Sequence, residues 1–249
     1  MTGHSAAAGQ SPGAPSFPWP LVKGHVSFAL LVWAGFVAFV LLVILAVAAV
    51  RGIEVSGWDR ATEAVRFYAV FIGIHLGYSQ LPLHITHGQT RREFAMQAAM
   101  FAGVFVTALA AMVAAGFVLE RGLYEVAGWP QDVSDGRLYT SPSELHWIFV
   151  QGWLVQGLWF VGGALIGAAW YRGAWSAGIA LTAAIIVAIV SQMFITSDWT
   201  PFMNIYEQAA GSADIQPALA TLYNLVLIGG LLAACWYVIR DIPIQNKAA

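Results

Sequence analysis

The chain has 249 residues, of which 59% are hydrophobic and only 10% are charged. Soluble domains carry about 25% charged residues, so this composition excludes an ordinary cytosolic enzyme and a disordered chain. The 11 basic and 13 acidic residues leave no positive excess to attract a phosphate backbone, so we expect no nucleic-acid partner. With a mean hydropathy of +0.70, the sequence predicts a membrane protein that crosses the lipid bilayer several times.

Residues 1–20 are rich in alanine, glycine, serine and proline and lack the basic and apolar regions of a signal peptide. We interpret them as a mobile cytoplasmic tail. Six apolar runs follow, each about as long as a helix that crosses a hydrocarbon core about 30 Å thick. The runs are residues 26–50, 67–85, 94–119, 146–170, 174–195 and 218–239. Because they lack the alternation of membrane strands, we predict an all-α membrane protein with six transmembrane helices in one domain, residues 21–241, and a C-terminal tail, residues 242–249.

The charges of the connecting segments predict the orientation of these helices. Six spans place both termini on one side of the membrane. The segments on that side hold six of the eleven basic residues and only two of the thirteen acidic residues, and they are short. Because basic residues are enriched in short cytoplasmic loops, we expect both termini in the cytoplasm and the protein in the plasma membrane.

The second run is the most polar, because it contains His75, Gln80 and His84, and His87 follows it. Polar residues inside a membrane are often functional, so a metal or haem site is one interpretation of these histidines. However, nine residues separate His75 from His84, which places them on opposite faces of an ideal α-helix. We therefore predict no metal site and expect His75 and Gln80 to form interhelical hydrogen bonds within the membrane.

The fourth run contains a pair of small residues, Gly163 and Gly167, at the spacing that lets two membrane helices approach closely. Packing within one chain is the favoured interpretation of this pair. A dimer seam and a substrate path are the alternatives.

Two capping boxes predict where helices begin. In the first, the Thr90 hydroxyl accepts from the backbone of Glu93 while the Glu93 carboxylate reaches back, which starts the third helix. Gly88 suits the left-handed residue that ends the second helix. The second box, residues 141–144 with Pro142 at the first helical position, predicts the start of the fourth helix.

The chain has no phosphate-binding loop for ATP. Such a loop requires Lys followed by Ser or Thr, whereas Lys23 precedes Gly24 and Lys247 precedes Ala248. We therefore assign no catalytic residue and no cofactor to this chain. Any ATP hydrolysis would belong to a partner subunit that carries the ATP and Mg²⁺.

The turn between the second and third runs, His87-Gly88-Gln89-Thr90-Arg91-Arg92-Glu93-Phe94, resembles the G-x-[ST]-R-R-x-F turn of ABC type-2 transporter permeases. Residues 119–124 and 237–244 are also similar to segments of small six-span permeases of that superfamily. The resemblance implies a homodimer, or a dimer with a related permease, that engages a separate ABC ATPase subunit through this turn. It also implies an outer re-entrant element near residues 197–217. The residues that it assigns to the ATPase-coupling turn are His84, His87, Gly88, Gln89, Thr90, Arg91, Arg92, Glu93 and Phe94.

The resulting expectation is a permease subunit of an ABC exporter, embedded in the lipid bilayer and without enzymatic activity of its own. The apolar spans favour an amphipathic or lipid-like cargo over a multiply charged ion. Two alternatives remain. One is an integral-membrane metalloprotein or oxidoreductase subunit that uses His75, His84 and His87. The other is a membrane scaffold that transports nothing.

Overall fold

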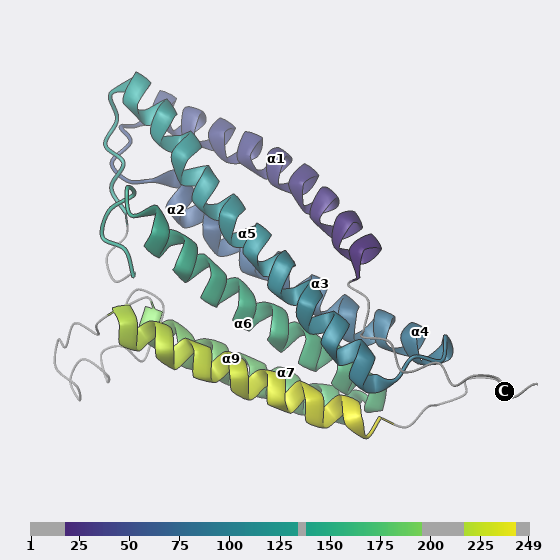
Figure 1. Cartoon of the computed structure of the whole chain (residues 1–249). Coiled ribbons are helices and arrows are strands. Elements are labelled where there is room, and N and C mark those ends of the chain that lie inside the picture. Colours follow the sequence, from purple (N-terminus) through teal and green to yellow (C-terminus); the bar gives the residue numbers. More distant parts are fainter. Residues whose placement is uncertain (1–17, 134–137, 196–216, 243–249) are drawn as a thin grey trace, which may run out of the picture.

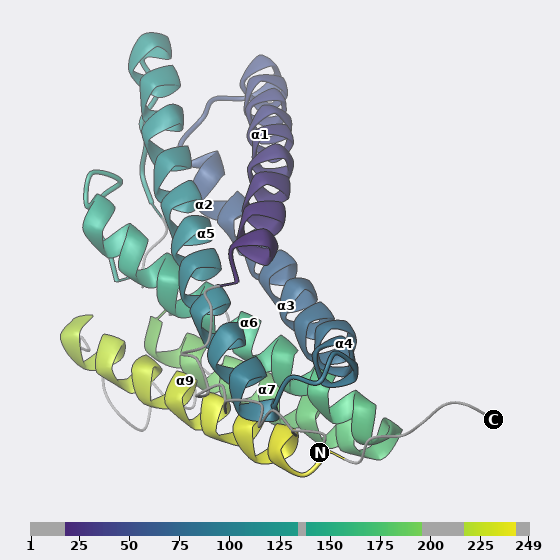
Figure 2. The same ribbon diagram turned by 45° about the vertical axis from the view of Figure 1, so that its right-hand side comes forward.

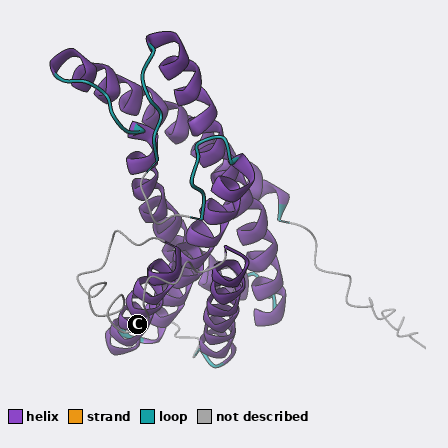
Figure 3. Cartoon of the chain, turned by 90° about the vertical axis from the view of Figure 1, so that its left-hand side faces the viewer, coloured by secondary structure: helices purple, strands orange, loops and turns teal. Residues whose placement is uncertain are grey.

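A computed structural model of the chain describes residues 18–133, 138–195 and 217–242, and this part is helical, without strands. Figure 3 shows the helices and their short connections. The elements are α1 (Trp19–Val50), α2 (Gly57–Ala61), the 3₁₀ turn η1 (Thr62–Ala64), α3 (Val65–His75), the π-helical turn η2 (Leu76–Gln80), α4 (Leu81–Thr86), α5 (Arg91–Ala127), α6 (Leu145–Arg172), α7 (Ala174–Ile195) and α9 (Pro217–Arg240).

Five helices in the described ranges, α1, α5, α6, α7 and α9, are long and apolar enough to cross a membrane. They coincide with five of the six predicted runs, which supports the prediction of a multi-pass, all-α membrane protein. The second predicted run is helical throughout but is divided into α3, η2 and α4, each too short to span by itself. The structure therefore supports five spans as single long helices and does not confirm the second predicted run as a sixth.

Helix α6 lies at the centre of the bundle, where it packs against α3, α5, α7 and α9 (Figures 1 and 2). Its apolar stretch is 67% buried, whereas that of α1 is 11% buried. Helix α1 therefore contacts the bundle along one narrow side and leaves most of its apolar surface available to lipid.

Glycines bring α6 close to α3 and η2. A Cβ atom on Gly163 or Gly167 would lie 2.2 or 2.4 Å from a backbone carbonyl oxygen of α3. On the facing side, a Cβ atom on Gly73 or Gly77 would lie 2.1 or 2.4 Å from a carbonyl oxygen of α6. Such distances exclude any side chain, so the two backbones touch. The structure therefore uses Gly163 and Gly167 for packing within one chain.

The predicted capping box at residues 141–144 is wrong. The helix begins at Leu145, three residues after the predicted first helical position, and no side chain caps it. The Glu144 carboxylate accepts hydrogen bonds from the backbone and the hydroxyl of Thr140, at 3.3 and 3.2 Å. The Ser141 hydroxyl accepts from the backbone of Ser143 instead of capping the helix. These bonds close a separate turn ahead of α6, in which both expected capping groups are already used.

The long helices define two ends of the bundle (Figure 1). At one end, which we call the α2 end, α2 lies beside the C-terminal part of α5. At the other, which we call the α4 end, lie the start of α1, the α4–α5 turn and the end of α9. The predicted coupling turn is thus at the α4 end.

Candidate functional site

The α4–α5 turn is fixed by a double hydrogen bond around Gly88. Gly88 has a φ of 78°, the left-handed conformation that favours glycine. Its N–H donates to the carbonyl of Ile85 at 3.0 Å, and the N–H of Gln89 donates to the carbonyl of His84 at 3.1 Å. This pair of bonds is the Schellman arrangement that ends a helix, so α4 stops at a defined residue as the sequence predicts.

The predicted capping box at the start of α5 is confirmed. The Thr90 hydroxyl accepts from the N–H of Glu93 at 3.2 Å. The Glu93 carboxylate accepts from the N–H and the hydroxyl of Thr90, at 2.8 and 2.9 Å. Glu93 is solvent-facing and precedes the apolar run. Its pKa is held below the ordinary value, mainly by the hydrogen bond from the Thr90 backbone and secondly by the bond from the Thr90 hydroxyl. The turn is thereby closed on both sides.

The two adjacent arginines of the turn have different surroundings. The guanidinium of Arg91 donates to the carbonyl oxygens of Arg240 and Ile242, at 2.7 and 2.6 Å, which ties the start of α5 to the end of α9. Arg92 is exposed and makes no hydrogen bond or ion pair with any described residue. The resemblance assigned both arginines to the coupling turn, and of the two only Arg92 has no partner among the described residues.

The remaining aromatic residues of the turn also divide into inward-facing and exposed side chains. Phe94 is buried, and its ring meets that of His84 edge-on, with centroids 5.1 Å apart. His87 is exposed, and its Nδ1 atom lies 2.6 Å from the carbonyl oxygen of Leu83. His84 therefore faces the protein interior while His87 faces away from it.

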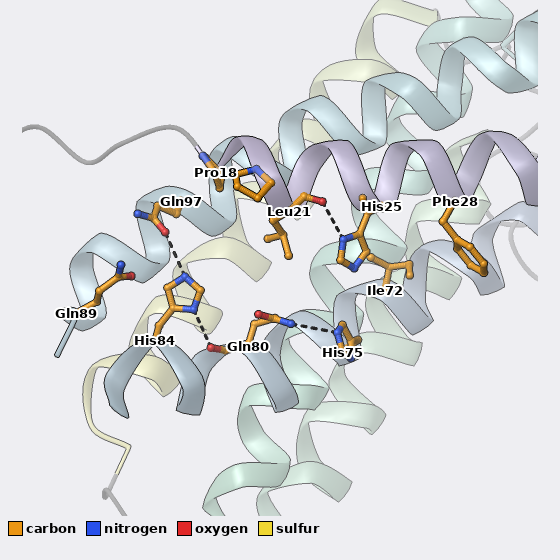
Figure 4. A pocket seen from close by; sticks show the side chains of 12 residues that line it. Pro18, Leu21, His25, Phe28, Ile72, His75, Gln80, His84, Gln89 and Gln97 are labelled. Carbon is orange, nitrogen blue, oxygen red and sulfur yellow. Dashed lines mark hydrogen bonds between the residues drawn. The ribbon is translucent and has the colours of Figure 1, made fainter. Parts of the chain in front are cut away.

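A cavity of about 800 Å³ opens at the α4 end between α1, the α3–η2–α4 segment and the start of α5 (Figure 4). Residues from these separate elements converge on it. Its polar lining consists of His25, His75, Gln80, His84, Gln89 and Gln97. We call this cavity the His25 pocket. Most of its polar residues lie in or beside the predicted second span, but His25 comes from α1, just ahead of the first apolar run, and sequence reasoning missed it.

The pocket contains both His75 and His84, so the prediction that they face opposite sides is wrong. The reason is the π-helical turn η2, which lies between them. A π turn closes its hydrogen bonds over five residues instead of four, so each residue rotates less about the axis. Rotation summed over nine residues then differs from that of an ideal α-helix, and the two rings reach the same cavity.

Backbone carbonyls fix the orientation of two of the imidazoles. The Nδ1 atom of His25 lies 2.9 Å from the Leu21 carbonyl, and the Nδ1 atom of His84 lies 2.9 Å from the Gln80 carbonyl. Because a carbonyl only accepts, Nδ1 carries the proton in both rings. In the neutral form of His25, Nε2 then carries the lone pair. The Nε2 atom of His84 lies 3.2 Å from the Oε1 atom of Gln97, which links α4 to α5.

The third imidazole, His75, lies opposite His25 (Figure 4). Their ring centroids are 6.0 Å apart. The Nε2 atom of His75 lies 3.3 Å from the Nε2 amide nitrogen of Gln80. The two residues thus contact each other within one helical segment instead of forming the predicted interhelical bond with each other. The Nε2 atom of His25 and the Nδ1 atom of His75 make no hydrogen bond with the described residues.

Geometry gives no support to the metalloprotein alternative. Within residues 18–133, 138–195 and 217–242, no three side chains of His, Cys, Asp or Glu are grouped so that they could hold a metal ion. The proposed third histidine, His87, is exposed outside the pocket.

A second polar cluster lies at the α2 end and is closed. Glu120 of α5 is 1% exposed. Its carboxylate accepts from the Ser56 hydroxyl at 2.5 Å, the Trp58 backbone N–H at 2.7 Å and the Gln131 amide at 2.9 Å. We call these four residues the Glu120 cluster. Glu120 directly follows the predicted third run, so its place at the membrane edge was visible in sequence, but its burial was not.

Two further charged residues near the Glu120 cluster, Asp59 and Arg66, are also buried. Asp59 is also 1% exposed and accepts a 2.7 Å hydrogen bond from the Tyr139 hydroxyl. Arg66 is 5% exposed and forms an ion pair with Glu63 one turn earlier. Each of these buried charges has a partner, as the cost of burying an isolated charge requires.

Neither protein-family models, nor curated proteins, nor solved structures match this chain. The implied re-entrant element at residues 197–217 lies outside the described residues except for Pro217, and so do most of the two predicted tails.

Proposed function

We propose that this chain is the membrane-spanning permease subunit of an ABC exporter, driven by a separately encoded ATPase. The observation that carries the proposal is the α4–α5 turn. It is closed by the Gly88 and Thr90 motifs and presents one exposed cation, Arg92, without a partner in the described part of the chain. Resemblance of the same turn to the permease motif supports this proposal.

Such a turn is suited to transmit force. A partner that contacts Arg92 would move the start of α5, a helix of 37 residues whose first turn is fixed by the capping box. The bonds from Arg91 extend that movement to the end of α9. A ligand that binds one arrangement of these helices more tightly than another shifts the population between them. In this proposal two permease subunits form the path, both termini are cytoplasmic, and the partner ATPases supply the ATP and Mg²⁺.

The test is Arg92→Glu in the full chain, co-expressed with a candidate ABC ATPase. Charge reversal at an interface changes binding by several kcal/mol, so we expect co-purification of the ATPase to fall at least about tenfold. Arg51→Glu is the control, because Arg51 is also exposed but lies at the opposite end of α1. The proposal is wrong if the Arg92 variant retains the ATPase like the wild type, or if no ABC ATPase binds the wild-type chain.

Two further variants separate this role from the alternatives. Arg91→Ala should disturb the end of α9 and leave direct recognition by Arg92 in place, so its defect should appear mainly in ATPase stimulation. A scaffold that transports nothing would bind a partner without stimulating ATP hydrolysis. Measuring ATPase activity in the same purified complexes distinguishes these cases.

A further inference from the structure

We infer that the His25 pocket binds the headgroup of an anionic amphiphile, with a phosphate-type oxyanion beside His25 and His75 and an alkyl chain along the apolar wall. The inference concerns ligand binding by this chain alone and does not depend on the ATPase.

The charge of the pocket favours an anion. Among the residues that the structure describes, its ionisable lining consists of three imidazoles, and no Asp or Glu lines it. The nearest acid in the turn, Glu93, is bound by Thr90 and does not line the pocket. Each imidazole is neutral or cationic, so bound anions meet no like charge there, whereas cations gain no counter-charge.

Hydrogen-bonding capacity also favours an oxyanion. The Nε2 atom of His25 and the Nδ1 atom of His75 have no partner among the described residues, and their rings face each other at a centroid distance of 6.0 Å. Because the Leu21 carbonyl already holds the Nδ1 proton of His25, a second proton on that ring is placed on Nε2, where it can donate to a ligand. Hydrogen bonds between charged groups of this kind are the strong ones.

The amide groups add further donors at the α4 end of the cavity. Gln89 lines the pocket and makes no side-chain hydrogen bond with a described residue, so its NH₂ group is available to the same ligand. Phosphate-type oxygens accept several bonds at once, which matches donors that arrive from α1, α3 and the turn.

The apolar part of the lining distinguishes an amphiphile from a free ion. Leu21, Phe28 and Ile72 form the wall beside His25, and Figure 4 shows Phe28 farthest from Gln89. A volume of about 800 Å³ lies in the range of small-molecule sites and far exceeds a phosphate ion. Because α1 is mostly exposed along its apolar surface, a chain can enter from the lipid side.

The test measures binding of dodecyl phosphate to the full chain in a maltoside detergent by native mass spectrometry. We expect one dodecyl phosphate per chain, whereas inorganic phosphate and dodecyltrimethylammonium should not bind. In His25→Ala with His75→Ala, affinity should fall about tenfold or more, because two charged hydrogen bonds are lost. The control, His87→Ala with His146→Ala, changes two exposed histidines outside the pocket and should bind like the wild type.

A second variant, His25→Gln with His75→Gln, keeps side chains that hydrogen-bond but cannot become cationic, and it should also weaken binding. Unfolding temperatures and elution volumes identify any variant that fails to fold. The inference is contradicted if both His25 variants bind dodecyl phosphate as tightly as the wild type does. It is also contradicted if the wild type binds dodecyltrimethylammonium as tightly as dodecyl phosphate. If the wild type binds inorganic phosphate as tightly as dodecyl phosphate, the alkyl chain plays no part in binding, the amphiphile assignment is wrong and the pocket is a simple anion site.

Discussion

The Glu120 cluster and the His25 pocket are both polar sites in an apolar bundle, but they differ in how their hydrogen bonds are used. In the cluster, the Glu120 carboxylate is 1% exposed and accepts from three donors of the protein. In the pocket, nitrogens of His25 and His75 face a cavity of about 800 Å³ without a described partner. The polar groups of the Glu120 cluster hold the fold together, because leaving them unpaired is costly. The polar groups of the His25 pocket remain available to a ligand.

The largest expected effect is a loss of stability at the Glu120 cluster. Glu120→Ala leaves the donors of Ser56, Trp58 and Gln131 without an acceptor, so we expect the free energy of unfolding to fall by about 3 kcal/mol. His25→Ala removes one bond to the Leu21 carbonyl and should cost far less. Thermal unfolding in detergent compares the two variants, with Glu125→Ala at an exposed position as the control. Equal losses for Glu120→Ala and His25→Ala would remove the distinction between the two sites.

The next effect tests the contact that holds the α3–η2 segment, and thus His75, in place. In Gly163→Ala the new Cβ atom would lie 2.2 Å from a backbone carbonyl oxygen, so the helices must separate. We expect a loss of about 2 kcal/mol, as for overpacked cores. In the matched variant, Gly230→Ala, the new Cβ atom meets nothing within 4 Å, and the better helix propensity of alanine should leave stability unchanged or slightly higher. Unfolding temperatures measure both variants. A Gly163→Ala chain as stable as Gly230→Ala would contradict the close packing of α3 and α6.

The smallest effect concerns the cap beside the pocket. Thr90→Ala removes the N-cap of α5 and should cost about 1 kcal/mol near neutral pH. The pKa of Glu93 is lowered from 4.5 in the folded state, so its contribution is present above that value and is lost as the pH falls through the lower, folded-state pKa. The difference in unfolding temperature between wild type and Thr90→Ala should therefore shrink below about pH 4.5. A constant difference down to pH 3 would show that the bond from the Thr90 hydroxyl to Glu93 does not contribute to the cap.

Local features of the fold were predictable because they depend on neighbouring residues. Hydropathy predicted the five long helices, and the spacing of Thr90 and Glu93 predicted the cap of α5. The same rule failed at Glu144, because Thr140 competes for its carboxylate and nothing in the motif itself excludes that competitor. A capping motif therefore predicts a helix start only where no other local donor is within reach.

The features that assemble the site were not predictable, since they join residues far apart in the chain. Arg91 binds the carbonyl oxygen of Arg240, 149 residues away, and no pattern in either segment indicates the pair. His25 comes within 6.0 Å of His75 because α1 packs beside α3, which hydropathy does not specify. Burial of Glu120 likewise depends on the position of Ser56 and Trp58 from a different segment.

The π-helical turn has a consequence for the comparison of related chains. Residues 76–80 rotate less than α-helical residues, which brings His84 to the same side as His75. A relative with the same number of residues in this stretch but an unbroken α-helix would keep the hydropathy and the histidines, yet would turn His84 away from His75. Two such relatives would look alike in every apolar span, while only one of them would possess the pocket. The helical geometry of this segment, more than the identity of its histidines, is therefore the character to follow through evolution.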